Sequence, residues 1–224
     1  MPVRRQLLLQ VSKNDALASK LLDEMVEEKL EDRTGQHPSV TDLLRCLTAS
    51  WWDAHRKVEH GKKKEIFFLI GIGLEKSLLA ARKQNPTAGE TDGIYWHIDD
   101  NDDGLIEVKS YRGSLKKVEQ ADGSFQLPDY YVQQVKSYCV MLGVNQCDLG
   151  IIYIIPAEFE VYHIEFDDLE LGLHRRWLMA RRDVWLVAEA KDKAPESYKH
   201  NQDWECRDCQ YKLLCQTRKQ DGAW

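Results

Sequence analysis

Long hydrophobic runs are missing from this sequence of 224 residues. No apolar stretch reaches the ~18 residues that a helix needs to cross a bilayer. The N-terminus lacks a signal-peptide pattern, because its basic start leads only into a brief apolar stretch at residues 7–9. Internal repeats and low-complexity tracts are also absent. We therefore expect a cytoplasmic protein in a reducing compartment, with no membrane partner.

The remaining composition is ordinary for a globular protein, with 43% apolar and 30% charged residues. The length suits one sizeable domain, or a domain with appendages. The net charge of −6 is unevenly spread, since residues 90–107 hold seven acids and no Lys or Arg. Residues 53–83 hold eight Lys or Arg against four acids. A bound metal would offset part of the acidic segment, while the basic segment could follow a phosphate backbone.

Hydrophobic periodicity divides the chain into helices and strands. Helices are predicted over residues 14–31, 40–54, 64–84, 128–142 and 168–190, and strands over 92–98, 104–110, 149–155 and 160–166. The first two strands should form an antiparallel hairpin. This order predicts the α/β class, as a layered domain with a small mixed sheet flanked by helices.

The most informative triplet is Glu107-Val108-Lys109, an E-x-K pattern on a predicted strand. Side chains two residues apart on a strand point to the same face. Asp92 lies fifteen residues before Glu107, on the neighbouring strand. Mg²⁺ prefers carboxylates, water and substrate phosphate as ligands, so Asp92 and Glu107 could hold it while Lys109 stabilises a phosphodiester transition state. A hairpin with a solvated polar face would show the same letters.

Three further acidic or polar features are less specific. Gln134 and Tyr138 are four residues apart on a predicted helix and share one face of it. Glu75 lies in the predicted helix 64–84 and would ordinarily be a surface acid. The turn at 99–104 matches the opening of an EF-hand loop, but position twelve is Ser110 in place of Glu, so we expect a solvated turn.

The six cysteines are unevenly placed. A C-x2-C-x5-C run is formed by Cys206, Cys209 and Cys215. Three close thiols in a reducing compartment indicate a metal or a cluster. Cys46 is a better fourth ligand than His200, and Cys139 in mid-helix is expected to be a core residue, which leaves Cys147 as the other thiol. Zinc is the alternative to an iron–sulfur cluster at this cysteine site.

The ordered set of motifs resembles the RecB-type branch of the PD-(D/E)xK nuclease superfamily. It is similar to the sub-branch with an iron–sulfur cluster, typified by the CRISPR-associated exonuclease family and the AddB nuclease domain. The matching motifs are Gly89-x-x-Asp92, Glu107-x-Lys109, Gln134-x-x-x-Tyr138 and Cys206/Cys209/Cys215, within residues 39–217. Residues 39–46, ending at Cys46, resemble the family's N-terminal cysteine segment.

The resemblance implies a restriction-endonuclease-like core over residues 39–224, with residues 1–38 as a helical extension. It implies Asp92 and Glu107 as ligands of Mg²⁺ or Mn²⁺, Lys109 as the catalytic lysine, and Gln134 and Tyr138 as residues that orient the site or the DNA strand. Glu75 stands where the family often has His and could reach the metal, and Thr91 stands where the superfamily name implies Pro. The four cysteines Cys46, Cys206, Cys209 and Cys215 would hold a 4Fe–4S cluster.

The expected function is therefore a metal-dependent DNA exonuclease acting on single strands or ends, in repair or CRISPR spacer acquisition. A homo-oligomer, or a CRISPR adaptation or helicase partner, is the expected assembly. One alternative is a non-catalytic DNA-binding subunit of a helicase–nuclease or CRISPR adaptation complex. Another is a site-specific restriction endonuclease, which has the same core but usually lacks the cysteine tail.

Overall fold

The computed structural model of the chain describes residues 37–56, 70–71, 73–74, 85–101, 104–111, 126–155, 157–196, 203–207 and 209–220. The predicted helix 14–31, Glu75 and His200 lie outside these ranges. The predicted domain boundary at residue 38 therefore stays a prediction. Within the described residues, no helix combines the length and apolar character that a membrane span requires.

The described strands form one five-stranded sheet in the order β1-β2-β3-β4-β5. Their bounds are β1 (Asn85–Thr91), β2 (Ile94–Asn101), β3 (Gly104–Tyr111), β4 (Gln146–Tyr153) and β5 (Glu158–Glu165). Three neighbouring pairs are antiparallel, whereas β3 and β4 are parallel. A parallel pair needs a crossover connection, and helix α5 (Asp129–Leu142) lies in it. The prediction of an α/β domain with a small mixed sheet is confirmed.

The predicted hairpin is present, but its first strand is shifted and has an unpredicted partner. β2 begins at Ile94 and continues through the acidic residues to Asn101. β1 was not predicted, because Pro86 and Gly89 interrupt the strand pattern. The structure explains why Pro86 and Gly89 occur in this strand. β1 is an edge strand, where proline is tolerated, and a Cβ on Gly89 would lie 2.5 Å from the Trp96 ring.

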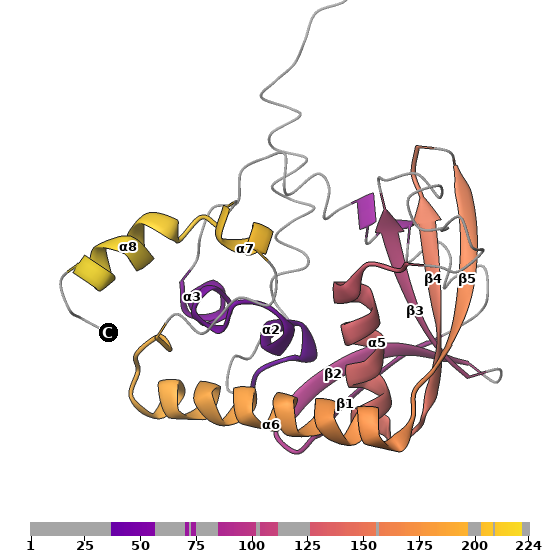
Figure 1. Cartoon of the computed structure of the whole chain (residues 1–224), viewed down its shortest axis with the longest axis horizontal. Coiled ribbons are helices and arrows are strands. Elements are labelled where there is room, and N and C mark those ends of the chain that lie inside the picture. The colour runs from indigo at the N-terminus through magenta and orange to yellow at the C-terminus, as the bar shows by residue number, and fades with distance from the viewer. Residues whose placement is uncertain are drawn as a thin grey trace, which may run out of the picture.

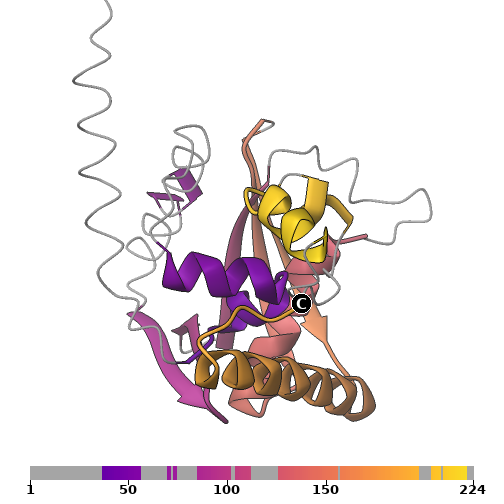
Figure 2. The ribbon, with the colours of Figure 1, turned by 90° about the vertical axis from the view of Figure 1, so that its left-hand side faces the viewer.

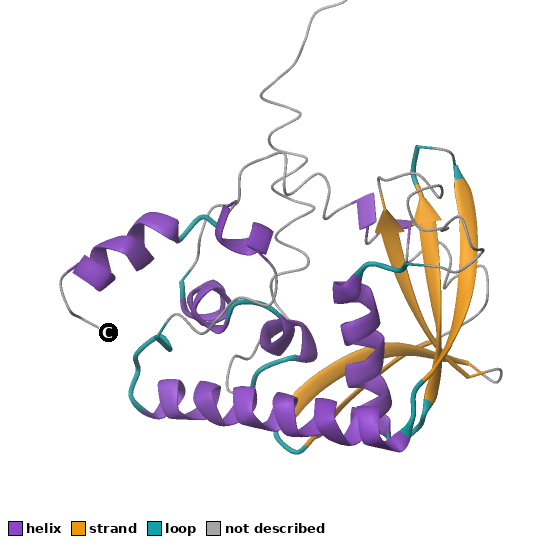
Figure 3. Cartoon of the chain, in the orientation of Figure 1, coloured by secondary structure: helices purple, strands orange, loops and turns teal. Residues whose placement is uncertain are grey.

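The helices lie mainly on one side of β3, β4 and β5 (Figure 3). α5 packs against the sheet, and α6 (Asp168–Ala190) runs along its lower end and beneath the other helices (Figure 1). α2 (Val40–Leu44) and α3 (Leu47–His55) follow above α6, and α7 (Asp203–Arg207) and α8 (Lys212–Gln220) lie beyond α3 (Figures 1 and 2). The core between these layers contains the fully buried side chains of Leu43, Leu47, Trp52, Leu149, Ile151, Leu178 and Trp185.

The predicted helix over 40–54 is in fact two helices, separated at Arg45 and Cys46. Arg45 is extended (φ −90°, ψ 177°), and Cys46 is the N-cap of α3. The Arg181 guanidinium of α6, which is 2% exposed, donates Nε to the Leu43 carbonyl and Nη2 to the Arg45 carbonyl. The last carbonyls of a helix have no partner within it. Arg181 supplies hydrogen-bond donors to these carbonyls. A residue far along the chain therefore stabilises the break between α2 and α3 that positions Cys46.

Replacing Arg181 by Ala should lower the free energy of unfolding by about 2–4 kcal/mol, because two buried carbonyls lose their donors. Urea denaturation would measure the change. The matched control is Arg176→Ala, an exposed arginine on the same helix, which should change the unfolding free energy by less than about 0.5 kcal/mol. Equal losses in the two variants would contradict the role given to Arg181.

Candidate active site

The predicted pair on β3 shares one face of the strand. Glu107 is only 7% exposed, and its Oε1 forms an ion pair with Lys109 Nζ. The alternation of side chains along a strand explains this meeting, since residues two apart project to the same side. Glu107 therefore does not lie on a solvated polar face, which was the alternative to a site here. A buried carboxylate requires such partners, because an uncompensated buried charge is strongly destabilising.

Helix α5 supplies the other two residues of this cluster. Gln134 and Tyr138 are both buried and lie one turn apart. Gln134 Nε2 donates to Glu107 Oε1 at 3.1 Å and to the Tyr138 hydroxyl at 2.8 Å. The structure thus brings together four of the predicted site residues, Glu107, Lys109, Gln134 and Tyr138. Both contacts to the carboxylate are made through Oε1, which fixes the orientation of the Glu107 side chain.

The first turn of α5 also lies over this part of β3. The Tyr131 hydroxyl donates to the Ser110 carbonyl at 3.2 Å. Burial raises the pKa of both Tyr130 and Tyr131, and the nearby charge of Lys109 opposes that rise. The end of β3 therefore meets a pair of half-buried tyrosine rings beside the lysine. No predicted motif includes Tyr130 or Tyr131, although their place in the first turn of the helix that follows Pro128 was a usable signal.

Asp92 lies in a different environment from Glu107. It occupies the β1–β2 turn with φ of 53°, and Gly93 follows with φ of 74°. Its carboxylate pairs with Arg175, and its carbonyl accepts from Arg182 Nη1 at 2.6 Å. Both arginines belong to α6, which therefore holds this turn in place. Asp92 is thus engaged by two cations of a helix that does not carry the Glu107 cluster.

The strand register sets the path along the sheet between the two acids. β2 pairs with β3 only through residues 99–101, next to the hairpin turn. Beyond this point β2 pairs with β1 and leaves β3 (Figure 1). Asp92 is seven residues before Asp99, which corresponds to roughly 20 Å of extended strand at ~3.3 Å per residue. The described contacts place Asp92 beside α6, and its predicted convergence with Glu107 on one cation stays a prediction.

No set of three or more His, Cys, Asp or Glu side chains within the described ranges is arranged to hold a metal ion. Glu75 and residues 102–103 of the acidic turn lie outside those ranges, so their predicted roles stay predictions. Glu107 is the buried carboxylate that the structure places beside the predicted lysine. Its oxygens are the kind of hard donor that Mg²⁺ and Mn²⁺ accept.

The C-terminal segment that carries Cys206, Cys209 and Cys215, here called the tail, packs against the segment that carries Cys46. Cys46 is the N-cap of α3, and its backbone N–H donates to Glu205 Oε1 at 3.1 Å. The Tyr211 ring lies 4.9 Å from the Trp52 ring, and the Tyr211 hydroxyl donates to Asp53 Oδ1 at 2.7 Å. Segments about 160 residues apart are therefore held together by hydrogen bonds and ring packing.

The four predicted ligand cysteines differ from the other two in burial. Cys139 and Cys147 are buried in the core, as expected for Cys139. Cys206 is exposed, and Cys46, Cys209 and Cys215 are half-buried. The docked tail brings the segments carrying these four thiols to one region of the molecule, around α3, α7 and α8 (Figure 2).

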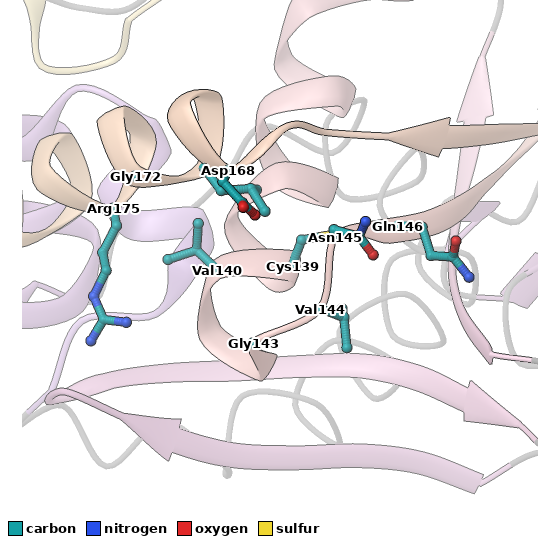
Figure 4. A pocket seen from close by; sticks show the side chains of 10 residues that line it. Cys139, Val140, Gly143, Val144, Asn145, Gln146, Asp168, Gly172 and Arg175 are labelled. Atoms are coloured by element: carbon teal, nitrogen blue, oxygen red, sulfur yellow. The ribbon is translucent and has the colours of Figure 1, made fainter.

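A hollow of about 630 Å³ lies at the other end of α5, between its C-terminus and the first half of α6 (Figure 4). Val140, Asn145, Asp168 and Arg175 are among the residues that line it. None of the four clustered site residues does. The hollow is thus separate from the candidate active site, although Arg175 connects it to the Asp92 turn.

No protein-family model matches the chain, and no curated protein matches it. Among solved structures, the crystal structure of SSO0001 is 16% identical, with a TM-score of 0.57 over 89% of this chain and 95% of that one. The two chains therefore share a fold. An alkaline exonuclease (LHK-Exo) from Laribacter hongkongensis is 15% identical, with a TM-score of 0.43 over 80% of this chain and 95% of that one. Its complex with dAMP gives 15% identity and a TM-score of 0.42, over 76% of this chain and 89% of that one.

Replacing Asp53 by Ala should release the tail from α3. Asp53 accepts hydrogen bonds from Tyr211, Gln210 and Arg45, and losing about 1–2 kcal/mol of local stability should speed amide exchange in residues 209–215 roughly tenfold. Hydrogen exchange followed by mass spectrometry would report it. Asp183→Ala removes an exposed acid on α6 and should leave exchange in the tail unchanged. Unaltered protection in the Asp53 variant would contradict the docking described above.

Proposed function

We propose that the chain is a divalent-metal-dependent DNA nuclease that hydrolyses phosphodiester bonds at the Glu107–Lys109 site. The supporting observation is the Glu107 carboxylate, 7% exposed, held beside Lys109 by a hydrogen bond from Gln134. A polar strand face without a function would be solvated. Here a buried acid is paired with a half-buried ammonium group on the face that α5 covers, and two of the motifs that the family resemblance connects, Glu107-x-Lys109 and Gln134-x-x-x-Tyr138, meet at one carboxylate.

The chemistry assigned to this chain's residues follows from their contacts. Glu107 would hold a Mg²⁺ or Mn²⁺ ion, which when bound supplies charge neutralisation at the scissile phosphate and a water of lowered pKa. Mg²⁺ is commonly bound through one or two carboxylates, with waters and substrate phosphate completing its coordination. Lys109, whose ammonium carries three donors, would turn from Oε1 to a phosphate oxygen or the attacking water. Gln134 would keep the Glu107 carboxylate in place during that change.

Asp92 and Glu75 are the two candidates for a second carboxylate ligand of the proposed metal ion. Asp92 would have to exchange its Arg175 partner for the metal and approach β3. Tyr138 acts through Gln134 as a positioning residue. The finer assignment, to exonuclease action on single strands or DNA ends in repair or CRISPR spacer acquisition, is supported by the motif resemblance alone. The proposed assembly, a homo-oligomer or a complex with a CRISPR adaptation or helicase partner, is also supported by the motif resemblance alone.

We also propose that Cys46, Cys206, Cys209 and Cys215 hold a 4Fe–4S cluster, with Zn²⁺ as the alternative. The donor set suits either group, because thiolates are the ligands of iron–sulfur clusters and of structural zinc. The docking of the tail through Glu205 and Tyr211 supports a shared site. A group bound there would join the two ends of the described chain and stabilise the fold by closing a long loop.

Substitution of Lys109 by Ala, or of Glu107 by Gln, should reduce metal-dependent degradation of end-labelled single-stranded DNA by at least about 100-fold, because transition-state charge loses its stabilising group. Gel analysis of time courses with Mg²⁺ or Mn²⁺ measures the rate. Lys191→Ala, an exposed lysine after α6, is the matched control and should retain full activity. Undiminished cleavage by the Lys109 variant would overturn the nuclease assignment. DNA binding without cleavage by the wild type would instead favour the non-catalytic subunit.

Protein purified without oxygen should be brown and contain iron and sulfide, because thiolate-bound clusters absorb visible light by charge transfer. Cys46→Ser and Cys209→Ser should each lose this absorption and most of the iron, and melt at a lower temperature. Cys139→Ala changes a buried core thiol and should keep the iron. Colourless protein with stoichiometric zinc would select the alternative metal, and colourless protein with neither metal would contradict the site.

A further inference from the structure

One side of α6 faces away from the elements that the helix packs against. Leu178, Arg181 and Trp185 are on its buried side, and α6 lies along the lower edge of the molecule, in contact with α2, α3 and α5 above it (Figure 1). At 3.6 residues per turn, residues that alternate at intervals of four and three share one side of a helix. The opposite side of α6 follows this spacing with six exposed residues. We call them the outer stripe: Leu169, Leu173, Arg176, Ala180, Asp183 and Val187.

The outer stripe is richer in apolar surface than a solvated helix face. Leu169 is 70% exposed, and Leu173 and Val187 are each 52% exposed. Apolar side chains scattered singly over a protein surface need no explanation. Here they form one row at heptad spacing, with the small side chain of Ala180 between them, which is the pattern by which two helices pack together. The row covers roughly 27 Å of helix at 1.5 Å per residue.

The charges of the outer stripe indicate what covers it. Arg176 and Asp183 are opposite in charge and two turns apart. In an antiparallel second copy, related by a two-fold axis at position 178, Leu169 would face Val187 of the second copy. Arg176 would then lie within one turn of Asp183 of the second copy. Because helical side chains lean toward their own N-terminus, these two would lean toward each other.

A parallel second copy would bring like charges together. Arg176 would face Arg176 of the second copy, and Asp183 would face Asp183 of the second copy. Like charges across an interface are repulsive and exclude the wrong arrangement. The outer stripe is therefore complementary to itself in the antiparallel orientation.

We propose that the outer stripe of α6 is a dimer interface, which binds a second copy of this chain in antiparallel orientation. The contact is isologous, because both copies use the same patch. It shares no residue with the Glu107 cluster or with the four predicted ligand cysteines. The proposal therefore goes beyond the nuclease function and does not depend on it. A monomeric chain would leave the nuclease assignment standing, and a dimer without cleavage would leave the interface standing.

The size of the interface sets the expected affinity. Two helices that meet along one stripe bury less than the ~1,200 Å² below which interfaces are weak. We therefore expect a dimer with a Kd of about 10 µM. Unfolding measured well below this concentration reports on the monomer.

Sedimentation equilibrium of the full chain, over about 1–200 µM, tests the interface. Val187→Glu should raise the dimer Kd at least about 10-fold, because a carboxylate would be buried against Leu169 of the second copy. Val161→Glu is the matched control, since Val161 is 49% exposed on the edge strand β5, against 52% for Val187. It should dimerise like the wild type.

Two outcomes of this experiment would overturn the interface. One is a wild type that is monomeric at every concentration, including the case in which Val187→Glu lowers its melting temperature because another segment of the same chain covers the stripe. The other is a dimer that Val161→Glu dissociates and Val187→Glu does not, which would place the contact on β5.

Exchange of the two charges tests the antiparallel orientation. Arg176→Asp should raise the dimer Kd at least about 10-fold, because it brings two carboxylates together across the interface. The double variant Arg176→Asp/Asp183→Arg should return to within about 3-fold of the wild-type Kd, because the charges are complementary again. Residues two turns apart on one helix do not pair with each other, so this rescue requires a contact between copies. A double variant as weak as Arg176→Asp would overturn the antiparallel dimer.

Discussion

The Glu107 carboxylate, buried beneath α5, is the constraint on which the rest of the site depends. A charge removed from water must be compensated by an opposite charge and by hydrogen bonds. Lys109 provides the charge and Gln134 the hydrogen bond, both at the same oxygen. This requirement sets the register of α5 over β3. It also places the first turn of α5, with Tyr130 and Tyr131, at the end of the strand where the lysine emerges.

A second buried cation sets the position of the cysteine segment. Arg181 ends α2 by donating hydrogen bonds to the carbonyls of Leu43 and Arg45, and the chain turns at Arg45 so that Cys46 becomes the N-cap of α3. Asp53 on α3 then accepts hydrogen bonds from Gln210 and Tyr211 of the tail. The candidate active site and the proposed cluster site are thus connected through α5 and α2, which pack against each other. This proximity gives a physical reason to expect that damage to the tail will affect the candidate active site as well as stability.

Some predictions failed for reasons of strand geometry. An edge strand containing proline and glycine has no alternating pattern to reveal it, so β1 was not predicted. Because β2 leaves β3 for β1, Asp92 lies at the far end of β2 beside Arg175. The helix at 40–54 was predicted unbroken because the residue that ends α2, Arg181, is 136 positions later than Arg45. Neither β1, the partner of β2, nor Arg181, the partner of the α2 end, can be recognised from a local sequence pattern.

Local rules were sufficient for other parts of the chain. The predicted 128–142 helix is α5, which begins one residue later, and the 168–190 helix has the predicted bounds. The period of two on a strand put Glu107 and Lys109 on one face. The four-residue spacing put Gln134 and Tyr138 on one face of α5. The sequence alone therefore determined the ends of α5 and α6 and the residue types of each motif, because these depend on neighbours along the chain. Which motifs meet was decided only by the tertiary structure, because strand register and buried ion pairs depend on residues far apart in sequence.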